Sequence, residues 1–234
     1  MLIGGIQKTT FLDYPGKVAT LLFTVGCNLR CQFCYNKEFV LPEEIKKNAD
    51  HYIEQQAIYN FLETRKGLID GVVICGWEPT LQKDLYECIY TIKQMGFLVK
   101  LDTNGRDPDM VRRLIDDHLI DYIAMDIKDC PYTWWTLVGS SEKYATYQKT
   151  ADIILASDVD YEFRTTVIKW YHTPSKIAQI AQSVQWAKKY ALQNFKAPRP
   201  LLNPYFKGKS FSLIELQELK EMVEPYVWAC EIRN

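Results

Sequence analysis

Three cysteines lie close together in one short stretch of the sequence, Cys27-Asn-Leu-Arg-Cys31-Gln-Phe-Cys34. Their C-x3-C-x2-C spacing puts three thiolates within reach of one inorganic centre. Thiolates are the usual ligands of iron–sulfur clusters, and a cluster of four irons normally takes four of them. The motif supplies only three, so it predicts a cluster with one iron open to a small molecule, just as catalytic metal sites keep a position that structural sites close.

Further polar groups follow apolar runs along the chain. In parallel α/β barrels, chemistry collects where strands end and loops begin. The sequence therefore predicts that these groups share one rim with the cysteine loop. They are Gly76-Trp77-Glu78-Pro79, Asp102-Thr103-Asn104-Gly105, Asp126-Ile127-Lys128 and Arg164. Other interpretations of the same residues are a strand-ending turn at 102–105, a surface ion pair at 126–128, and an arginine that supports a structural carboxylate.

The elements that must position these residues alternate between apolar runs and helical patterns. Strands are predicted at 18–25, 72–75, 97–101, 120–127, 161–168 and, as the last barrel strand, 192–195. Helices are predicted from the apolar stripe at 85–92, from Asp107-Pro108, over 143–157, from Thr173-Pro174, and over about 213–224, where Ser212-Leu-Ile-Glu215 reads as a capping box. Such alternation predicts a parallel sheet with helices outside it. About six repeats favour an α/β fold of the partial, open β/α barrel type.

The length of 234 residues suits one domain, because α/β barrels commonly reach this size as a single unit. We expect a single domain over 1–234, with a core barrel over about 17–196 and a C-terminal, helix-containing appendage over about 197–234. Pro198-Arg-Pro200 and Asn203-Pro204 predict an irregular segment before the last helix.

Charge and composition limit the classes of partner. The formal net charge of −1 gives no sign of a nucleic-acid or membrane surface. No apolar stretch approaches the ~18 residues of a membrane span, and the first residues lack the pattern of a signal peptide. We therefore expect a cytoplasmic protein with neither nucleic acid nor membrane as partner. Three of the seven cysteines are crowded together, which favours metal binding over a disulfide framework.

A zinc site is the main alternative for the cysteine loop, with a distant fourth ligand. His51, His118, His172 and four further cysteines are available for it. The histidines are expected to be ordinary exposed residues, and Cys75 and Cys88 are expected to be small buried hydrophobes. Trp134-Trp135 is interpreted either as a patch that docks a partner or as buried packing.

In these residues the chain resembles the radical S-adenosylmethionine enzymes. More narrowly, it is similar to the proteins that activate glycyl-radical enzymes, most of all the activators of anaerobic ribonucleoside-triphosphate reductase. The resemblance is carried by the cysteine spacing with Phe33 inside it, by Tyr35-Asn36, by the rim motifs, and by the opening Gly4-Gly-Ile-Gln-Lys-Thr-Thr10 with Asp13-Tyr-Pro-Gly16. It covers most of the chain.

The resemblance implies an oxidoreductase in which Cys27, Cys31 and Cys34 hold a [4Fe–4S] cluster. Its open iron would bind S-adenosylmethionine, and reductive cleavage would yield a 5′-deoxyadenosyl radical that takes a hydrogen atom from a glycine of the partner, anaerobic ribonucleotide reductase. An external flavodoxin or ferredoxin would supply the electron. Alternatives are activation of a formate-lyase type of glycyl-radical enzyme, or a cluster protein whose Trp77 impairs cofactor binding.

The resemblance also implies roles for the rim. Residues 76–79 match a Gly-Gly-Glu-Pro segment that holds the methionine amino group, with Glu78 as an acceptor for the ammonium. Asp102, Thr103, Asp126 and Lys128 resemble positions around the methionine carboxylate and a nearby monovalent cation. Lys128 and Arg164 would balance that carboxylate, and Phe33 and Tyr35 would line the adenine side.

One residue departs from the pattern. Trp77 stands where the family has glycine, and glycine at such a position usually serves a positive φ or a close approach to a ligand. The indole must then either point away from the site or fill part of it.

Overall fold

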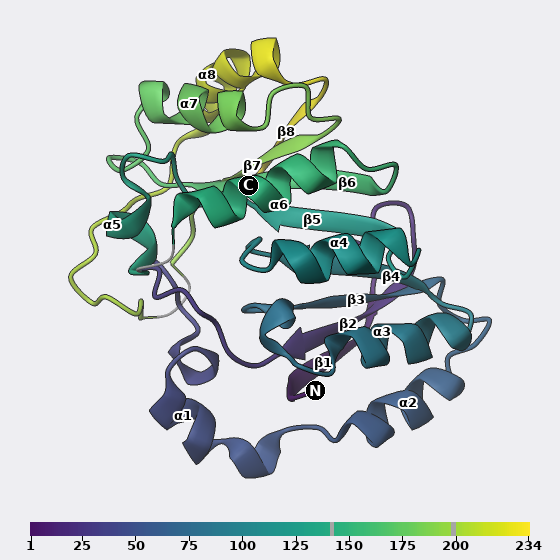
Figure 1. Cartoon of the computed structure of the whole chain (residues 1–234). Coiled ribbons are helices and arrows are strands. Elements are labelled where there is room, and N and C mark those ends of the chain that lie inside the picture. Colours follow the sequence, from purple (N-terminus) through teal and green to yellow (C-terminus); the bar gives the residue numbers. More distant parts are fainter. Residues whose placement is uncertain (141–142, 198–199) are drawn as a thin grey trace.

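Eight strands form one sheet whose spatial order follows the sequence, as the computed structural model of residues 1–140, 143–197 and 200–234 shows (Figure 1). The first two strands pair antiparallel, and every later neighbouring pair is parallel. The strands are β1 Ile3–Thr10, β2 Ala19–Thr24, β3 Gly71–Gly76, β4 Leu98–Thr103, β5 Tyr122–Asp126, β6 Asp160–Val167, β7 Tyr190–Asn194 and β8 Cys230–Arg233. Strands β1 and β8 end this order, so the predicted α/β fold with an open, partial barrel is confirmed.

The central strands are buried on both faces, which explains their almost continuous apolar sequences. Val72, Val73 and Ile74 of β3 have no exposed surface, although their side chains point alternately to the two sides of the sheet. Parallel sheets have this character because helices cover one face while the other faces the core.

Helices cover the outside of the sheet, and Figure 1 shows α3, α4 and α6 lying over it. Side-chain caps fix several starts: Asp107 accepts from the Met110 N–H, Thr173 from the Lys176 N–H, and Ser212 forms the predicted capping box with Glu215. The helices are α1 Pro42–Lys47, α2 Gln55–Glu63, α3 Leu85–Gln94, α4 Pro108–Asp116, α5 Trp134–Val138, α6 Tyr144–Leu155, α7 Pro174–Ser183 and α8 Leu213–Val223, with 3₁₀ turns at Lys37–Phe39, Ala49–His51, Pro79–Leu81 and Glu224–Tyr226.

Two strands at the edges of the sheet escaped the sequence prediction. The segment predicted as the last barrel strand is β7, and β8 pairs beyond it. Strand β1 contains two glycines and several polar residues, and β8 has only four residues, so neither shows an apolar run. The irregular segment predicted from Pro198 begins outside the described residues, at 198 and 199.

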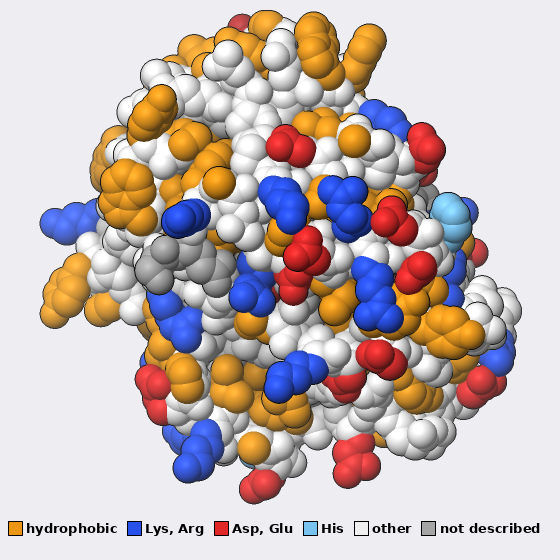
Figure 2. All heavy atoms as spheres, in the orientation of Figure 1, with side chains coloured by type: hydrophobic (Ala, Val, Ile, Leu, Met, Phe, Trp, Pro, Cys, Tyr) orange, Lys and Arg blue, Asp and Glu red, His pale blue; other side chains and the backbone are white. Residues whose placement is uncertain are grey.

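The outer surface carries mixed charge. On the face shown in Figure 2, Lys and Arg side chains alternate with Asp and Glu side chains, in keeping with the net charge of −1. Across the part of the chain that the structure describes, no helix is both long enough and apolar enough to span a membrane.

An ion pair ties the edge strand β8 to the interior of the barrel. Arg233 donates to both carboxylate oxygens of Glu162 on β6, at 2.9 and 2.6 Å. The Glu162 side chain is only 3% exposed, and a buried charge is tolerated only when it is paired. Burial alone would raise the pKa of Glu162, but Arg233 holds it below its usual value.

Replacing Arg233 with Met should lower the free energy of unfolding by about 2 kcal/mol at neutral pH. The value lies below that of a fully buried pair because the arginine is partly exposed. The native pair stabilises the fold above the ordinary carboxyl pKa, and this stability is lost as pH falls through the lowered pKa. The difference between wild type and Arg233→Met, measured by urea unfolding, should therefore shrink in acid.

The double variant Glu162→Gln/Arg233→Met serves as the control, because it removes both charges. It should regain part of the lost stability. A difference between wild type and Arg233→Met that is the same at pH 7 and pH 4 would contradict this account.

Candidate active site

A cavity of about 570 Å³ opens at the carboxyl ends of the parallel strands, which is a usual size for a small-molecule site. The cysteine loop after β2 lines one part of it, and the ends of β3 to β6 line another. Among the residues predicted for the site, all but Glu78 line this cavity: Cys27, Cys31, Phe33, Cys34, Tyr35, Gly76, Trp77, Asp102, Thr103, Asp126, Lys128 and Arg164.

Contacts with distant parts of the chain hold the cysteine loop in place. The backbone N–H groups of Arg30 and Gln32 donate to the carbonyls of Val138 and Leu137, at 2.7 and 3.1 Å. The Leu202 N–H donates to the Cys34 carbonyl at 2.6 Å. The loop has little regular secondary structure, so its shape depends on α5 and on the segment that follows β7.

Burial keeps the three thiols neutral in the protein alone. It raises the pKa of Cys27 to about 11 and that of Cys31 to about 12, and it raises that of Cys34 as well. The ammonium of Lys128 opposes all three shifts. Metal coordination deprotonates a thiol outright, so a bound metal rather than the protein would generate the thiolates.

The three thiols of the loop do not form a site for a single metal ion. Within residues 1–140, 143–197 and 200–234, no three His, Cys, Asp or Glu side chains converge as one metal ion requires. A zinc ion draws its thiolates to about 2.3 Å from one point. In a cluster, each cysteine binds its own iron and the thiolates stand farther apart. Cys27, Cys31 and Cys34 all line the cavity, and their thiols interact electrostatically with one another.

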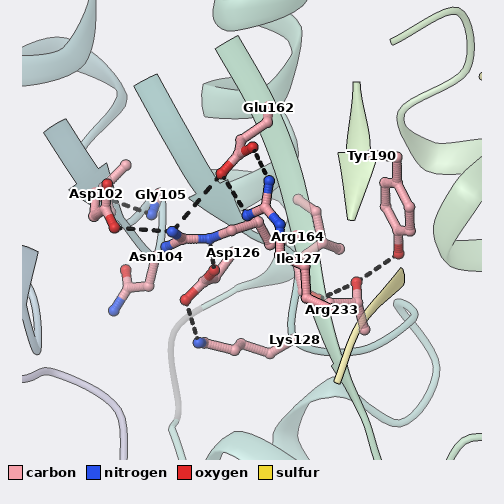
Figure 3. A network of polar contacts seen from close by, with 12 residues as sticks. Asp102, Asn104, Gly105, Asp126, Ile127, Lys128, Glu162, Arg164, Tyr190 and Arg233 are labelled. Atoms are coloured by element: carbon pink, nitrogen blue, oxygen red, sulfur yellow. Dashed lines mark hydrogen bonds and ion pairs between the residues drawn. The ribbon is translucent and has the colours of Figure 1, made fainter. Parts of the chain in front are cut away.

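Charged side chains from β4, β5 and β6 form a chain of contacts beside the cavity (Figure 3). Lys128 Nζ donates to Asp126 Oδ2 at 2.7 Å, and Arg164 Nε donates to the other Asp126 oxygen at 2.8 Å. Arg164 also reaches Asp102 Oδ2 at 2.8 Å, and Lys100 contacts Asp102 Oδ1. Burial opposes ionisation, yet these cations hold the pKa of both aspartates below its usual range.

Glu78 does not line the cavity. Its carboxylate was predicted to accept from the cofactor ammonium, but in the structure it accepts from groups of the protein. It is fully buried. Its Oε1 accepts from the Thr80 N–H and hydroxyl and from the Thr103 hydroxyl, and its Oε2 accepts the Asn104 N–H at 2.6 Å. Burial raises the pKa of Glu78, and these hydrogen bonds counter the rise. The Glu78 carboxylate therefore connects the end of β3 to the end of β4 through hydrogen bonds.

Gly76 and Trp77 shape the wall between the cysteine loop and β3. Gly76 has φ +115°, and a Cβ there would stand 2.4 Å from the Thr24 carbonyl oxygen, so only glycine fits. Trp77 is half-buried and lines the cavity. Its ring stacks on Phe39 at 4.3 Å, and a side-chain hydrogen bond from it counters the burial-raised pKa of Cys34. The indole is thus part of the wall and does not point away.

Other cavity residues were given no individual role from the sequence. The Asn104 amide donates to Asn28 Oδ1 at 2.9 Å and lies 3.9 Å from Cys27 Sγ, so it links the β4 rim to the cysteine loop. Its place inside a predicted rim motif was the available signal. Gly4 and Gly5 of β1 also line the cavity. They had no such signal because β1 itself lacks an apolar run.

The aromatic residues of the cysteine loop differ in exposure. Phe33 is 9% exposed and packs against Phe195 and Phe206, each at 6.4 Å between ring centroids. Tyr35 is 41% exposed. Phe33 therefore joins the loop to the segment after β7, while Tyr35 lies nearer to solvent.

One prediction about the histidines is wrong. His51 and His118 are exposed, but His172 is buried. Its Nδ1 accepts the Ile168 N–H at 2.9 Å, and its Nε2 lies 3.3 Å from the Lys128 carbonyl oxygen. Burial lowers the pKa of His172 to about 4, so the ring braces the backbone next to Lys128 as a neutral group.

Two other interpretations are resolved by burial. Cys75 and Cys88 are buried as predicted, although Cys75 also lines the cavity. Trp134 is 2% exposed and Trp135 is 61% exposed, so the first packs inside while the second faces solvent.

Known proteins resemble the chain in sequence and in fold. Residues 21–189 match the radical SAM superfamily. A glycyl-radical enzyme activating enzyme of Methanocaldococcus jannaschii is 33% identical over the whole of this chain and 96% of that protein. The pyruvate formate-lyase-activating enzyme of Listeria monocytogenes is 32% identical over 54% of this chain and 52% of that protein.

Two solved structures share the fold. Streptococcus suis SuiB bound to S-adenosylmethionine superposes with a TM-score of 0.68 at 15% identity, over 92% of this chain and 52% of SuiB. TYW1 with a lysine–pyruvate adduct bound gives a TM-score of 0.60 at 18% identity, over 89% of this chain and 74% of TYW1.

Replacing Glu78 with Ala should lower the free energy of unfolding of the metal-free protein by about 3 kcal/mol. The change leaves the buried N–H groups of Thr80 and Asn104 without acceptors, and each unsatisfied group costs about 1–3 kcal/mol. Urea unfolding measures the effect. The exposed pair Glu63 and Lys66 gives a matched control, since Glu63→Ala should change stability by less than about 0.5 kcal/mol. Equal losses in the two variants would refute the role of Glu78 in connecting the two strand ends.

Proposed function

The chain belongs to the radical SAM superfamily and, within it, to the glycyl-radical enzyme activating proteins, and we propose that its protein substrate is anaerobic ribonucleoside-triphosphate reductase. The sharing of one cavity by Cys27, Cys31 and Cys34 with the charged rim of β4 to β6 supports the radical chemistry, and the resemblance of the opening residues 4–16 supports the choice of the reductase. When bound, a [4Fe–4S] cluster and S-adenosylmethionine supply the radical that removes a hydrogen atom from a glycine α-carbon.

In this proposal the cysteine loop provides three thiolates and leaves one iron for the cofactor. Cys75 lines the same cavity but belongs to another neighbourhood. Its thiol interacts electrostatically with Asp102, Lys100 and Arg164, whereas the thiols of the loop interact with one another and with Lys128. These sets of neighbours support three ligands and leave Cys75 as a buried thiol.

The rim residues are proposed to hold the methionine end of the cofactor. Lys128 and Arg164 line the cavity and carry positive charge, which suits a carboxylate. Glu78 has its oxygens occupied, so backbone carbonyls near Gly76 and Trp77 are proposed as acceptors for the amino group. Phe33 and Tyr35 are proposed to line the adenine side.

Enclosure is the other contribution of the protein. The cavity lies at the end of a partial barrel whose strands are buried on both faces. A closed site excludes water and prevents side reactions of a reactive species. An external flavodoxin or ferredoxin is proposed as the electron donor, because the three loop cysteines account for one cluster only.

Activation of a formate-lyase type of enzyme is the second candidate function. It is favoured by the 32% identity to pyruvate formate-lyase-activating enzyme. That match covers 54% of this chain, whereas the glycyl-radical enzyme activating enzyme of M. jannaschii matches all of it.

The reconstituted protein, with dithionite and S-adenosylmethionine, should produce a glycyl radical on anaerobic ribonucleotide reductase, measured by electron paramagnetic resonance under strict anaerobiosis. Cys34→Ala should lose the cluster and all radical formation. Cys75→Ser should keep its iron and sulfide content and form the radical. A signal only on pyruvate formate-lyase would favour the second candidate, and the absence of 5′-deoxyadenosine with either partner would indicate a cluster protein without this activity.

Replacing Trp77 with Gly should tighten S-adenosylmethionine binding by about fivefold, equivalent to ~1 kcal/mol. The change removes an indole from the cavity wall and lets the cofactor approach the backbone closely. Equilibrium dialysis measures the affinity, with iron and sulfide content checked first. Trp77→Phe is the matched control, because it keeps an aromatic ring against Phe39 and should bind like wild type. Unchanged affinity in Trp77→Gly would show that the indole does not restrict the cofactor.

A further inference from the structure

The two aspartates at the rim are the residues that the family resemblance associates with a monovalent cation. Asp102 and Asp126 both line the cavity, and carboxylate oxygens are suitable ligands for a hard cation. Whether a cation can bind there depends on how many of their four oxygens are available.

All four carboxylate oxygens already have a cationic partner from the protein. Asp102 Oδ1 contacts Lys100 Nζ, and Asp102 Oδ2 accepts from Arg164 Nη1 at 2.8 Å. Asp126 Oδ1 accepts from Arg164 Nε at 2.8 Å, and Asp126 Oδ2 accepts from Lys128 Nζ at 2.7 Å. Figure 3 shows the guanidinium lying between the two carboxylates, where it bridges β4 and β5. A bound ion would have to displace at least one of these partners.

The charge balance also offers no attraction to an additional cation. The connected network holds four cationic side chains and four carboxylates, namely Lys100, Lys128, Arg164 and Arg233 against Asp102, Asp126, Glu162 and Glu231. Except for Arg233 and Glu231, which lie nearer to solvent, these side chains are at most 24% exposed, so solvent screens their charges poorly. The charges of the network are balanced, so a further cation would find no excess negative charge there.

An arginine can join two carboxylates in a way that a lysine cannot. Its planar guanidinium presents several donors in a fixed geometry, so one side chain can join two carboxylates and hold their separation. Arg164 itself is on β6, within the sheet, and its side chain is 13% exposed. The guanidinium is therefore a permanent part of the site and needs no ion from solution.

We propose that Arg164 replaces the monovalent cation in this chain, so that S-adenosylmethionine binds without dependence on potassium or sodium. The inference rests on the proposed cofactor site. It makes Arg164 a positioning residue, which fixes Asp102 and Asp126 and thereby the rim to which the methionine carboxylate would bind.

The experiment compares cofactor binding in different salts at one ionic strength. Equilibrium dialysis of S-adenosylmethionine against the reconstituted protein is done in potassium chloride, sodium chloride or choline chloride. The wild-type Kd should agree within twofold across the three salts. In Arg164→Met, the two carboxylates lose their shared partner, so affinity should fall in choline chloride and recover at least fivefold in potassium or sodium chloride.

Controls separate a lost guanidinium from general damage. Arg113→Met removes an exposed arginine of α4, which is 4.0 Å from Asp117, and should bind like wild type in all three salts. Arg164→Lys keeps the charge but cannot join both carboxylates, so it should show the same salt dependence as Arg164→Met. It also serves as the second variant if Arg164→Met does not fold.

A second readout uses the protein without cluster or cofactor. Thallium(I), a probe for potassium sites, should show no specific binding to the wild type by thallium-205 magnetic resonance, and specific binding to Arg164→Met or Arg164→Lys. Specific thallium binding to the wild type, or a wild-type Kd that weakens fivefold or more in choline chloride, would overturn the inference. Failure to bind S-adenosylmethionine in any salt would instead refute the proposed cofactor site, and the thallium measurement would still decide the role of Arg164.

Discussion

The site depends on one constraint: carboxylates inside a partial barrel must be neutralised where solvent reaches them poorly. Asp102, Asp126 and Glu162 come from three neighbouring strands, and each is paired to side chains of the same interior. Removing charges from water carries a large desolvation penalty, which is offset only in good geometry. Because Arg164 contacts both aspartates, the carboxyl ends of β4, β5 and β6 are held at fixed separations. The rim of the cavity is therefore rigid where the proposed cofactor would bind.

The cysteine loop is held by a different principle. It lies between β2 and the first 3₁₀ turn, yet its backbone forms hydrogen bonds with the backbone of α5 and with that of Leu202. Phe33 joins it to Phe195 and Phe206 by edge and tilted ring contacts. Segments more than a hundred residues away therefore fix the loop. The part of the chain after β7 therefore supports the cysteine loop from behind, although none of its described residues lines the cavity.

The features that could be predicted from the sequence are those that depend on residues close together along the chain. Periodicity identified the six central parallel strands, caps identified helix starts such as Asp107 and Ser212, and motif spacing brought the rim residues to one cavity. Features that depend on contacts between distant parts of the chain could not be predicted from the sequence. His172 is buried because the turn after β6 places its ring beside the Lys128 carbonyl. Glu78 accepts a hydrogen bond from the Asn104 N–H at the end of β4, and this donor comes close to it only in the folded chain. Neither partner is visible from sequence spacing.

Lys128 connects the two halves of the site. Its ammonium neutralises Asp126 and also opposes the rise that burial causes in the pKa of the three thiols. Because burial keeps those thiols protonated, each one that binds iron must release a proton. A fixed positive charge beside them makes that release easier and stabilises the thiolates afterwards. The same charge lies on the cavity wall, so one ammonium would favour both the assembly of the proposed cluster and the approach of an anionic ligand. His172 holds the backbone of this residue as a neutral ring, and so it positions the charge without adding to it.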